Sequence, residues 1–136
     1  MENHPFKIDI DYIQPGVVHF EDNIDSSFYL IEGRDKALLI DTGCGGGNIH
    51  RLASAFTDKP IELAVTHDHG DHDAHAMEFS KVYMHRADID GMREKQERFR
   101  IPENERLDPA HFTPVEDGSV IPLGDITTFF TYSKLF

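Results

Sequence analysis

The stretch "VTHDHGDHDAH", residues 65–75, constrains this chain more than any other feature, since it places four histidines and three aspartates in eleven positions. It follows directly on "IELAVT" (61–66), whose apolar and β-branched residues predict a strand. The cluster therefore lies at the C-terminal end of a predicted strand, where the backbone leaves the sheet. Side chains of these types are the common protein ligands of metal ions.

The spacing within the cluster indicates how such ions would be bound. His67 and His69 are two positions apart, so in an extended segment both imidazoles leave the same face and can bind one ion. Asp71 and His72 come where the chain turns into the next helix, so their side chains can diverge toward a second ion about 3.5–4 Å from the first. The alternative is a solvated loop in which Asp71 or Asp73 only caps that helix.

The residues before the cluster predict an antiparallel meander followed by one helix. Alternating or β-branched runs indicate strands at 7–13, 16–22, 27–33 and 37–43, with "GRDK" (33–36) as the turn between the last two. A helix is predicted next by apolar residues at helical spacing, and Pro60 ends it before the strand 61–66. Its apolar residues are Ile49, Leu52, Ala53 and Phe56.

The residues after the cluster continue the alternation of helix and strand. We expect a short helix at 73–80, a strand at 81–86 and a charged helix at 87–100 that ends before Pro102. Residues 112–136 predict one or two hairpins, with Asp117 and Gly118 at the first turn. Single helices between strands favour a mixed α/β fold of the α+β type, and 136 residues suit one domain, 1–136.

Composition narrows the classes of partner. The chain has 13 Lys and Arg against 25 Asp and Glu, a net charge of −12, which repels nucleic acid and anionic membrane surfaces. The N-terminus lacks a basic stretch followed by an apolar core, and no apolar run is long enough to span a membrane. Cys44 is the single cysteine, as expected in a reducing compartment. We therefore expect a cytoplasmic protein with no nucleic-acid or membrane partner.

The cluster resembles the signature of the metallo-β-lactamase-fold hydrolases, Thr-His-x-His-x-Asp-His after a strand, here Thr66, His67, His69, Asp71 and His72. The earlier "ALLIDTG" (37–43) is similar to the family's strand that ends in Asp-x-Gly. The resemblance implies an αββα sandwich with metals at one edge of its two sheets, and hydrolysis by a metal-bound hydroxide. It implies one or two zinc ions, with iron or manganese as alternatives, bound by His67, His69, Asp71 and His72.

The same resemblance assigns roles to single residues. Asp71 would bind metal and orient the nucleophile as the catalytic residue, while Asp41 and Thr66 would support the ligands without binding the ion. Diiron oxidoreductases of this fold carry Glu where this chain has His69, so hydrolysis is favoured over redox chemistry. The resemblance is closer to glyoxalase II-like hydrolases, which implies a small-molecule ester, thioester or lactone as substrate.

One part of the family pattern is missing. A catalytic zinc usually has three protein ligands and a water, whereas the two half-sites here supply two ligands each. In the family a third histidine follows the last hairpin, but this chain reads "ITTFFTYSKLF" (126–136) there and stops. We therefore expect the N-terminal half of the sandwich, incomplete at its C-terminus and impaired in hydrolysis. Three further histidines could substitute for the missing ligand, but their positions do not match the family pattern and we expect them to be surface or structural residues: His75, His85 and His111.

Two other functions stay open at this point. One is a non-catalytic half-domain that binds metal weakly, and the other is a phosphodiesterase or nuclease of the same fold. A half-sandwich would leave a sheet face and a strand edge open to water, which favours association. We expect a homodimer that packs these faces together, with possible exchange of C-terminal strands. The apolar residues that suggest it are Phe129, Phe130, Tyr132, Leu135 and Phe136.

Overall fold

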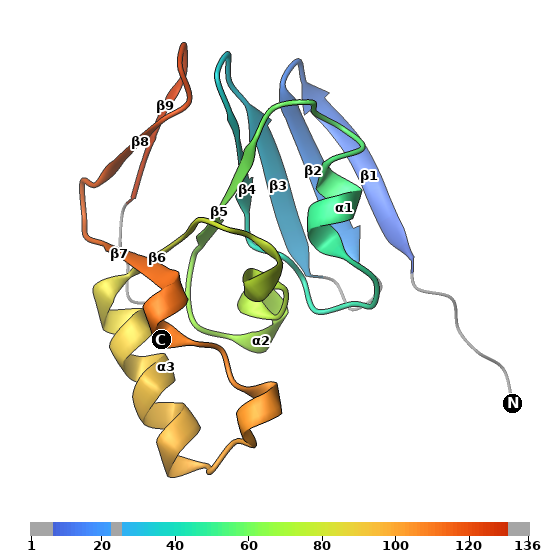
Figure 1. The fold of residues 1–136 in the computed structure, drawn as a ribbon. Helices are drawn as coiled ribbons and strands as arrows, with labels where there is room; N and C mark the ends of the chain where they lie inside the picture. Colours follow the sequence, from blue (N-terminus) through green and yellow to red (C-terminus); the bar gives the residue numbers. More distant parts are fainter. Residues whose placement is uncertain (1–6, 23–25, 131–136) are drawn as a thin grey trace, which may run out of the picture.

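The computed structural model describes residues 7–22 and 26–130, apart from the side chain of Asp71 (Figure 1). Its main feature is a sheet of seven strands that lie side by side in chain order. The first four pair antiparallel, and each later strand pairs parallel to the one before it. The strands are β1 (Ile8–Gln14), β2 (Val17–Asp22), β3 (Ser27–Glu32), β4 (Ala37–Ile40), β5 (Ile61–Val65), β6 (Val82–His85) and β7 (Phe112–Val115).

The expected meander is confirmed, and its turns have clear local causes. Gly16 joins β1 to β2 with a φ of 80°, a left-handed conformation that glycine adopts without strain. Between β3 and β4, the Gly33 amide donates to the Lys36 carbonyl at 3.0 Å and closes the predicted "GRDK" turn. Successive side chains of a strand point to opposite faces of the sheet, and Val18 and Phe20 of β2 are both buried on the same face.

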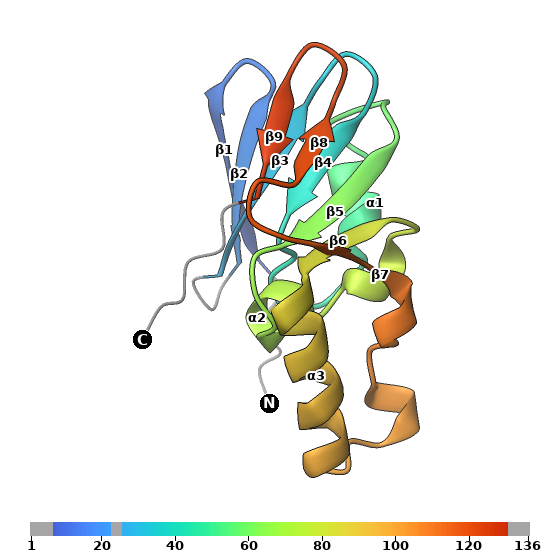
Figure 2. The same cartoon turned by 90° about the vertical axis from the view of Figure 1, so that its left-hand side faces the viewer.

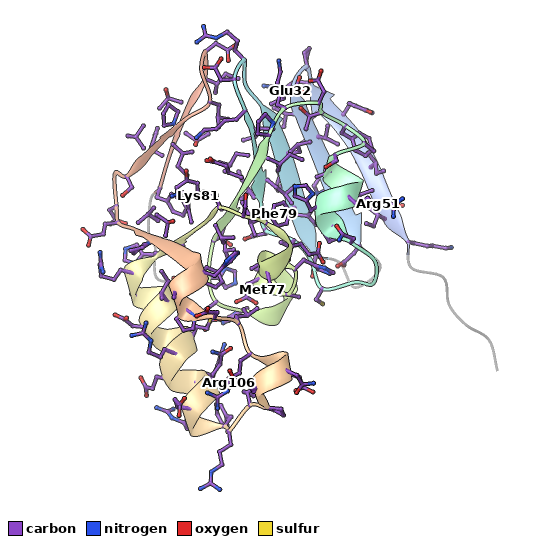
Figure 3. All side chains as sticks on the ribbon, viewed as in Figure 1. Glu32, Arg51, Met77, Phe79, Lys81 and Arg106 are labelled. Carbon is purple, nitrogen blue, oxygen red and sulfur yellow. The ribbon has the colours of Figure 1, made fainter. Side chains whose placement is uncertain are left out.

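Three helices pack on that face of the sheet: α1 (Ile49–Ala53), α2 (Gly70–Asp73) and α3 (Arg86–Arg98) (Figures 1 and 2). Ile49 and Ala53 of α1 and Ile89 and Met92 of α3 join the core formed by the apolar side chains of the strands. Phe79, which follows α2, is buried and lies under α1 with its ring 5.1 Å from that of His50 (Figure 3). None of the helices in the described ranges is long and apolar enough to span a bilayer.

A hairpin of β8 (Val120–Pro122) and β9 (Thr127–Phe129) lies over the other face, in front of β3 and β4 in Figure 2. Ile121 and Leu123 bury themselves against Leu38 and Ala64 of the sheet. The Asp35 amide also donates to the Leu123 carbonyl at 2.9 Å. The mixed sheet with a few flanking helices is the fold expected for half of a metallo-β-lactamase sandwich. The expected exchange of C-terminal strands concerns residues 131–136, which lie outside the described residues.

The uncovered part of this second face is acidic. In the pairing of β1 with β2, Asp9 lies beside Glu21 and Asp11 lies beside His19. In the pairing of β2 with β3, His19 lies beside Tyr29. All of these side chains therefore lie on the side of the sheet that carries the hairpin. Asp9 and Asp11 are exposed. The second face is therefore apolar under the hairpin and charged over β1 and β2.

Two sequence expectations about local structure were wrong. The helix expected at 73–80 begins earlier as α2, because the His69 carbonyl accepts from the amides of His72 and Asp73; a 3₁₀ turn, Ala76–Glu78, follows. Asp117 and Gly118 do not turn a hairpin, since β7 pairs with β6 and the chain passes through them to the second sheet. The hairpin turns instead at Gly124, whose φ is 110°.

Candidate metal centre

The histidine cluster leaves the sheet at the end of β5, as the sequence predicts. Thr66 follows the strand, and His69, with φ −132° and ψ 145°, is the residue from which α2 begins. The rings of His67 and His69 lie 4.5 Å apart between centroids, and those of His67 and His72 lie 4.0 Å apart. Three imidazoles from six consecutive positions are thus packed together, His69 exposed and the other two half-buried.

Asp41, at the end of β4, supports this group from beneath. Its Oδ1 accepts from the Thr66 amide at 2.7 Å, and its Oδ2 accepts from the Thr66 hydroxyl at 2.7 Å. The same Oδ2 lies 2.8 Å from Nδ1 of His72. Asp41 is 5% exposed, so the carboxylate side of these three contacts is buried. The resemblance implied a supporting role for Asp41 and Thr66, and that role remains a prediction.

The parallel pairing of β4 with β5 explains why Asp41 reaches Thr66. Ile40 lies beside Ala64 in the register, so the next residues of both strands come out at the same edge of the sheet. Asp41 also donates its amide to the Ala64 carbonyl at 2.9 Å. Its φ of 66° is a left-handed conformation that Asp tolerates better than most residues, and it turns the chain toward the histidines.

The hydrogen bonds also decide which nitrogen of two histidines is protonated. A carboxylate only accepts, so Nδ1 of His72 donates to Asp41, and the neutral form of the ring then has its lone pair on Nε2. The Thr66 hydroxyl gives its proton to Asp41, so it accepts at 2.9 Å from Nδ1 of His67. Both rings are thereby held as the Nδ1–H tautomer, in which Nε2 is the nitrogen that can bind a metal.

Thr42, which the sequence pattern did not single out, holds the other side of the histidine loop by hydrogen bonds. The Thr42 amide donates to the His72 carbonyl at 3.0 Å, and the Thr42 hydroxyl accepts from the His75 amide at 3.3 Å. Thr42 is fully buried. No signal in a single sequence separates it from an ordinary strand-end threonine, because its partner lies 30 positions away.

The histidine loop also contacts α3, through Asp68, Asp73 and Lys95. Lys95 Nζ lies 2.9 Å from Asp68 Oδ2 and donates to the Asp68 carbonyl at 3.1 Å. Burial of Asp73, with a hydrogen bond to the Asp68 carboxyl and its negative charge, raises the pKa of Asp73 to about 8, although Lys95 opposes the shift. The alternative in which Asp71 or Asp73 only caps the helix did not anticipate this burial, since Asp73 is 3% exposed.

Three further histidines, His75, His85 and His111, contact partners of their own. His75 bonds to Glu78 Oε2 at 2.5 Å and to the Gly45 carbonyl at 2.8 Å. His111 bonds to the Phe79 carbonyl at 2.6 Å. His85 accepts from the Ala87 amide at 3.1 Å at the start of α3. None of these contacts lies on the Asp41 network.

The donors fit a divalent metal in kind, because neutral imidazole nitrogens are common ligands of zinc. Among the described residues, however, no three His, Cys, Asp or Glu side chains are placed so that together they could hold an ion. The side chain of Asp71 is not among those residues, so the ligand set of His67, His69, Asp71 and His72 remains a prediction. The same holds for its division between two ions.

Comparison with known proteins decides the family. A family model described as the metallo-beta-lactamase superfamily matches residues 22–132. The chain belongs to this superfamily. Superfamily members bind divalent metals, usually zinc. A search of curated proteins found no match.

Solved metallo-beta-lactamases share the fold. One from Pontibacter korlensis is 17% identical with a TM-score of 0.65, over 89% of this chain and 58% of the other. One from Cronobacter sakazakii, described by a HARLDQ motif, is 22% identical with a TM-score of 0.64, over 87% and 50%. The DIM-1 metallo-beta-lactamase is 15% identical with a TM-score of 0.66, over 93% and 60%. The chain thus spans about half to three-fifths of the length of these structures.

Proposed function

We propose that the protein is a zinc-dependent hydrolase of a small ester, thioester or lactone, with His67, His69, Asp71 and His72 as metal ligands. The observation that carries the proposal is the Asp41 network. A buried carboxylate fixes the ring of His72 directly and that of His67 through the Thr66 hydroxyl. A solvated loop has no need of such support, whereas metal-binding histidines are commonly oriented by a carboxylate in this way.

In the proposed hydrolysis, Asp41 and Asp71 would have different roles. Asp41 holds His67 and His72 in the tautomer that presents Nε2, so that the two rings need little reorganisation on binding an ion. Asp71, assigned from the motif, would bind metal and orient the attacking water. The zinc ion would supply water that ionises near neutral pH and would polarise the bond under attack. The single cysteine supports a cytoplasmic location.

A second candidate, metal binding without turnover, is favoured by a different observation. Three ligands placed to share one ion are absent from the described residues. A catalytic zinc normally has three protein ligands and one open position. A chain that offers only two to each ion would bind metal weakly and exchange it readily, without the fixed geometry that hydrolysis needs.

Metal analysis and turnover measured on the same samples separate the two candidates. The protein is loaded with zinc, dialysed, and assayed for bound metal and for hydrolysis of aryl esters, thioesters and lactones. The hydrolase predicts about one or more zinc ions per chain and turnover that EDTA removes. His67→Ala should abolish both, while His19→Gln, which alters a histidine on β2 that bonds to Ser27, should preserve both. Bound zinc without turnover would instead establish the second candidate.

A further inference from the structure

The network of Asp41 supports two of the three clustered histidines. It fixes the ring of His72 directly and that of His67 through the Thr66 hydroxyl. No hydrogen bond in the described part of the chain carries this network on to the ring of His69. That ring is exposed and lies against the ring of His67, with the centroids 4.5 Å apart. The direction in which His69 points therefore depends on its backbone.

The backbone is held on both sides of His69. Before it, the His69 amide donates to the His67 carbonyl at 3.0 Å, and the Asp68 carbonyl accepts from Lys95 Nζ at 3.1 Å. This amide and this carbonyl belong to one peptide plane, which is thus held at both edges. After it, the His69 carbonyl accepts from two amides of α2 at 2.8 and 3.0 Å. The two planes together fix the direction in which the side chain leaves the chain.

Of these contacts, the one from Lys95 comes from outside the metal loop. Lys95 lies on α3, 27 positions after Asp68, and α3 lies beside α2 in both views (Figures 1 and 2). Met92, one turn before Lys95, is buried in the core, so the helix offers a fixed support. Asp88, on the same side of α3, has its Oδ1 3.5 Å from the Asp68 amide. One side of α3 therefore faces the residue between His67 and His69.

Lys95 also binds the carboxylate of Asp68. Its Nζ lies 2.9 Å from Asp68 Oδ2, and the Asp68 side chain is only 11% exposed. An ion pair between two exposed side chains contributes little, because both can reorient in water. Here a single ammonium group contacts the buried carboxylate and the carbonyl of the same residue. These two contacts confine Asp68 to one conformation and with it the peptide plane that precedes His69.

We propose that Lys95 is the positioning residue for His69, as Asp41 is for His67 and His72. The inference rests on the proposed function, because it takes His69 to be a zinc ligand. Lys95 touches neither metal nor substrate and acts through Asp68. Its effect is opposite in sign to that of its charge, since a cation near the site by itself disfavours binding of a dication. A loss of zinc affinity on removal of Lys95 thus reports positioning and not charge.

The test combines zinc affinity, by chelator competition, with amide hydrogen exchange of the metal-free full chain. Lys95→Met removes both contacts and should weaken zinc affinity about tenfold. It should also speed exchange of the His69 amide at least about fivefold. Lys95→Arg keeps a donor for both contacts, and the open hollow of about 340 Å³ beside Lys95 has room for it, so both values should stay within about threefold of wild type. Asp68→Asn keeps the carbonyl contact and should lose less zinc affinity than Lys95→Met.

Arg98→Met is the matched control. It removes a cation from the same helix, where Arg98 pairs with Glu94 and both side chains are about two-thirds exposed. Zinc affinity and exchange of the His69 amide should equal those of wild type. Urea unfolding of each metal-free variant shows that it is folded, and Asp68→Asn carries the test alone should Lys95→Met fail to fold.

The outcomes separate this inference from the proposed function. A wild type that binds no zinc would refute both. A wild type that binds zinc, with Lys95→Met binding it equally well or more tightly, would refute the positioning role alone. The same holds if Lys95→Met lowers the free energy of unfolding but leaves exchange of the His69 amide unchanged, which is the result of a merely structural ion pair. An equal loss of zinc affinity in Arg98→Met or in Lys95→Arg would also overturn it.

Discussion

The carboxylate of Asp41 lies 2.8 Å from Nδ1 of His72, a residue 31 positions later in the chain. The same oxygen accepts the Thr66 hydroxyl proton, and that hydroxyl is 2.9 Å from Nδ1 of His67. One buried acid therefore sets the orientation and the protonation of two proposed metal ligands. Its removal should act on metal binding although it is not itself a ligand.

Asp41→Asn should weaken zinc affinity by about 10- to 100-fold. Asn tolerates the left-handed φ of 66° at this position, so the backbone is kept while the charge is lost. Competition with a chromophoric chelator gives the dissociation constant. Asp58→Asn, at an exposed aspartate after α1, is the control and should bind zinc as wild type does. An unchanged affinity for Asp41→Asn would make Asp41 a turn residue only.

Thr66→Val and Thr66→Ser should behave differently. Valine has nearly the shape of threonine but no hydroxyl, so it breaks the link from Asp41 to His67 and should lower zinc affinity about tenfold. Serine keeps the hydroxyl and should stay within about twofold of wild type. Equal losses in the two variants, measured by the same chelator competition, would show that packing and not the hydroxyl matters at this position.

Asp73 should make the metal-free protein less stable as the pH rises. Its pKa is raised from 3.8 to about 8 in the folded state, so between these values the folded chain keeps a proton that the unfolded chain has lost. The free energy of unfolding therefore decreases as pH rises through this window. Urea unfolding at several pH values should show a decrease for wild type that is smaller in Asp73→Asn. Parallel pH curves for the two proteins would contradict the assignment.

Gly33→Ala should destabilise the attachment of the hairpin. A Cβ at Gly33 would lie 2.4 Å from both the Cβ and the carbonyl oxygen of Leu123, and the backbone must shift to admit it. We expect a loss of about 1–3 kcal/mol in the free energy of unfolding. Gly46→Ala is the control, because nothing lies within 4 Å of its added methyl group. Thermal unfolding that ranks the two variants equally would contradict the close contact.

Local patterns in the sequence predicted the parts of the fold that depend on local rules. Alternation found β1 to β3, because a strand covered on one side carries its apolar residues at every second position. The apolar run "ALLI" found β4, because β4 is covered on both faces, with Leu39 in the core on the helix side and Leu38 under the hairpin. The route after β7 was not predictable in this way. Asp-Gly at 117 and 118 has the composition of a hairpin turn, but the parallel pairing of β7 with β6 takes β7 out of reach of β8.

The same distinction applies to the candidate site. The histidines were singled out because their residue type and spacing are themselves the signal, and Asp41 was singled out by the family resemblance. Thr42 and the Asp68–Lys95 ion pair were missed, since their roles depend on which distant residue each one meets. The early start of α2 was missed because helix periodicity counts apolar residues, and α2 carries only glycine, aspartate and histidine.

The parallel pairing of β4 with β5 also bears on the order in which the chain folds. Asp41 meets Thr66 across 25 positions and His72 across 31, whereas the hairpin meets the sheet across far more, for example 91 between Arg34 and Asp125. Contacts close in sequence lose little loop entropy and tend to form first. The framework is therefore expected to assemble before the hairpin docks onto the sheet from residue 120 onward. A zinc ion bound at that stage would direct folding of the chain in addition to occupying the finished protein.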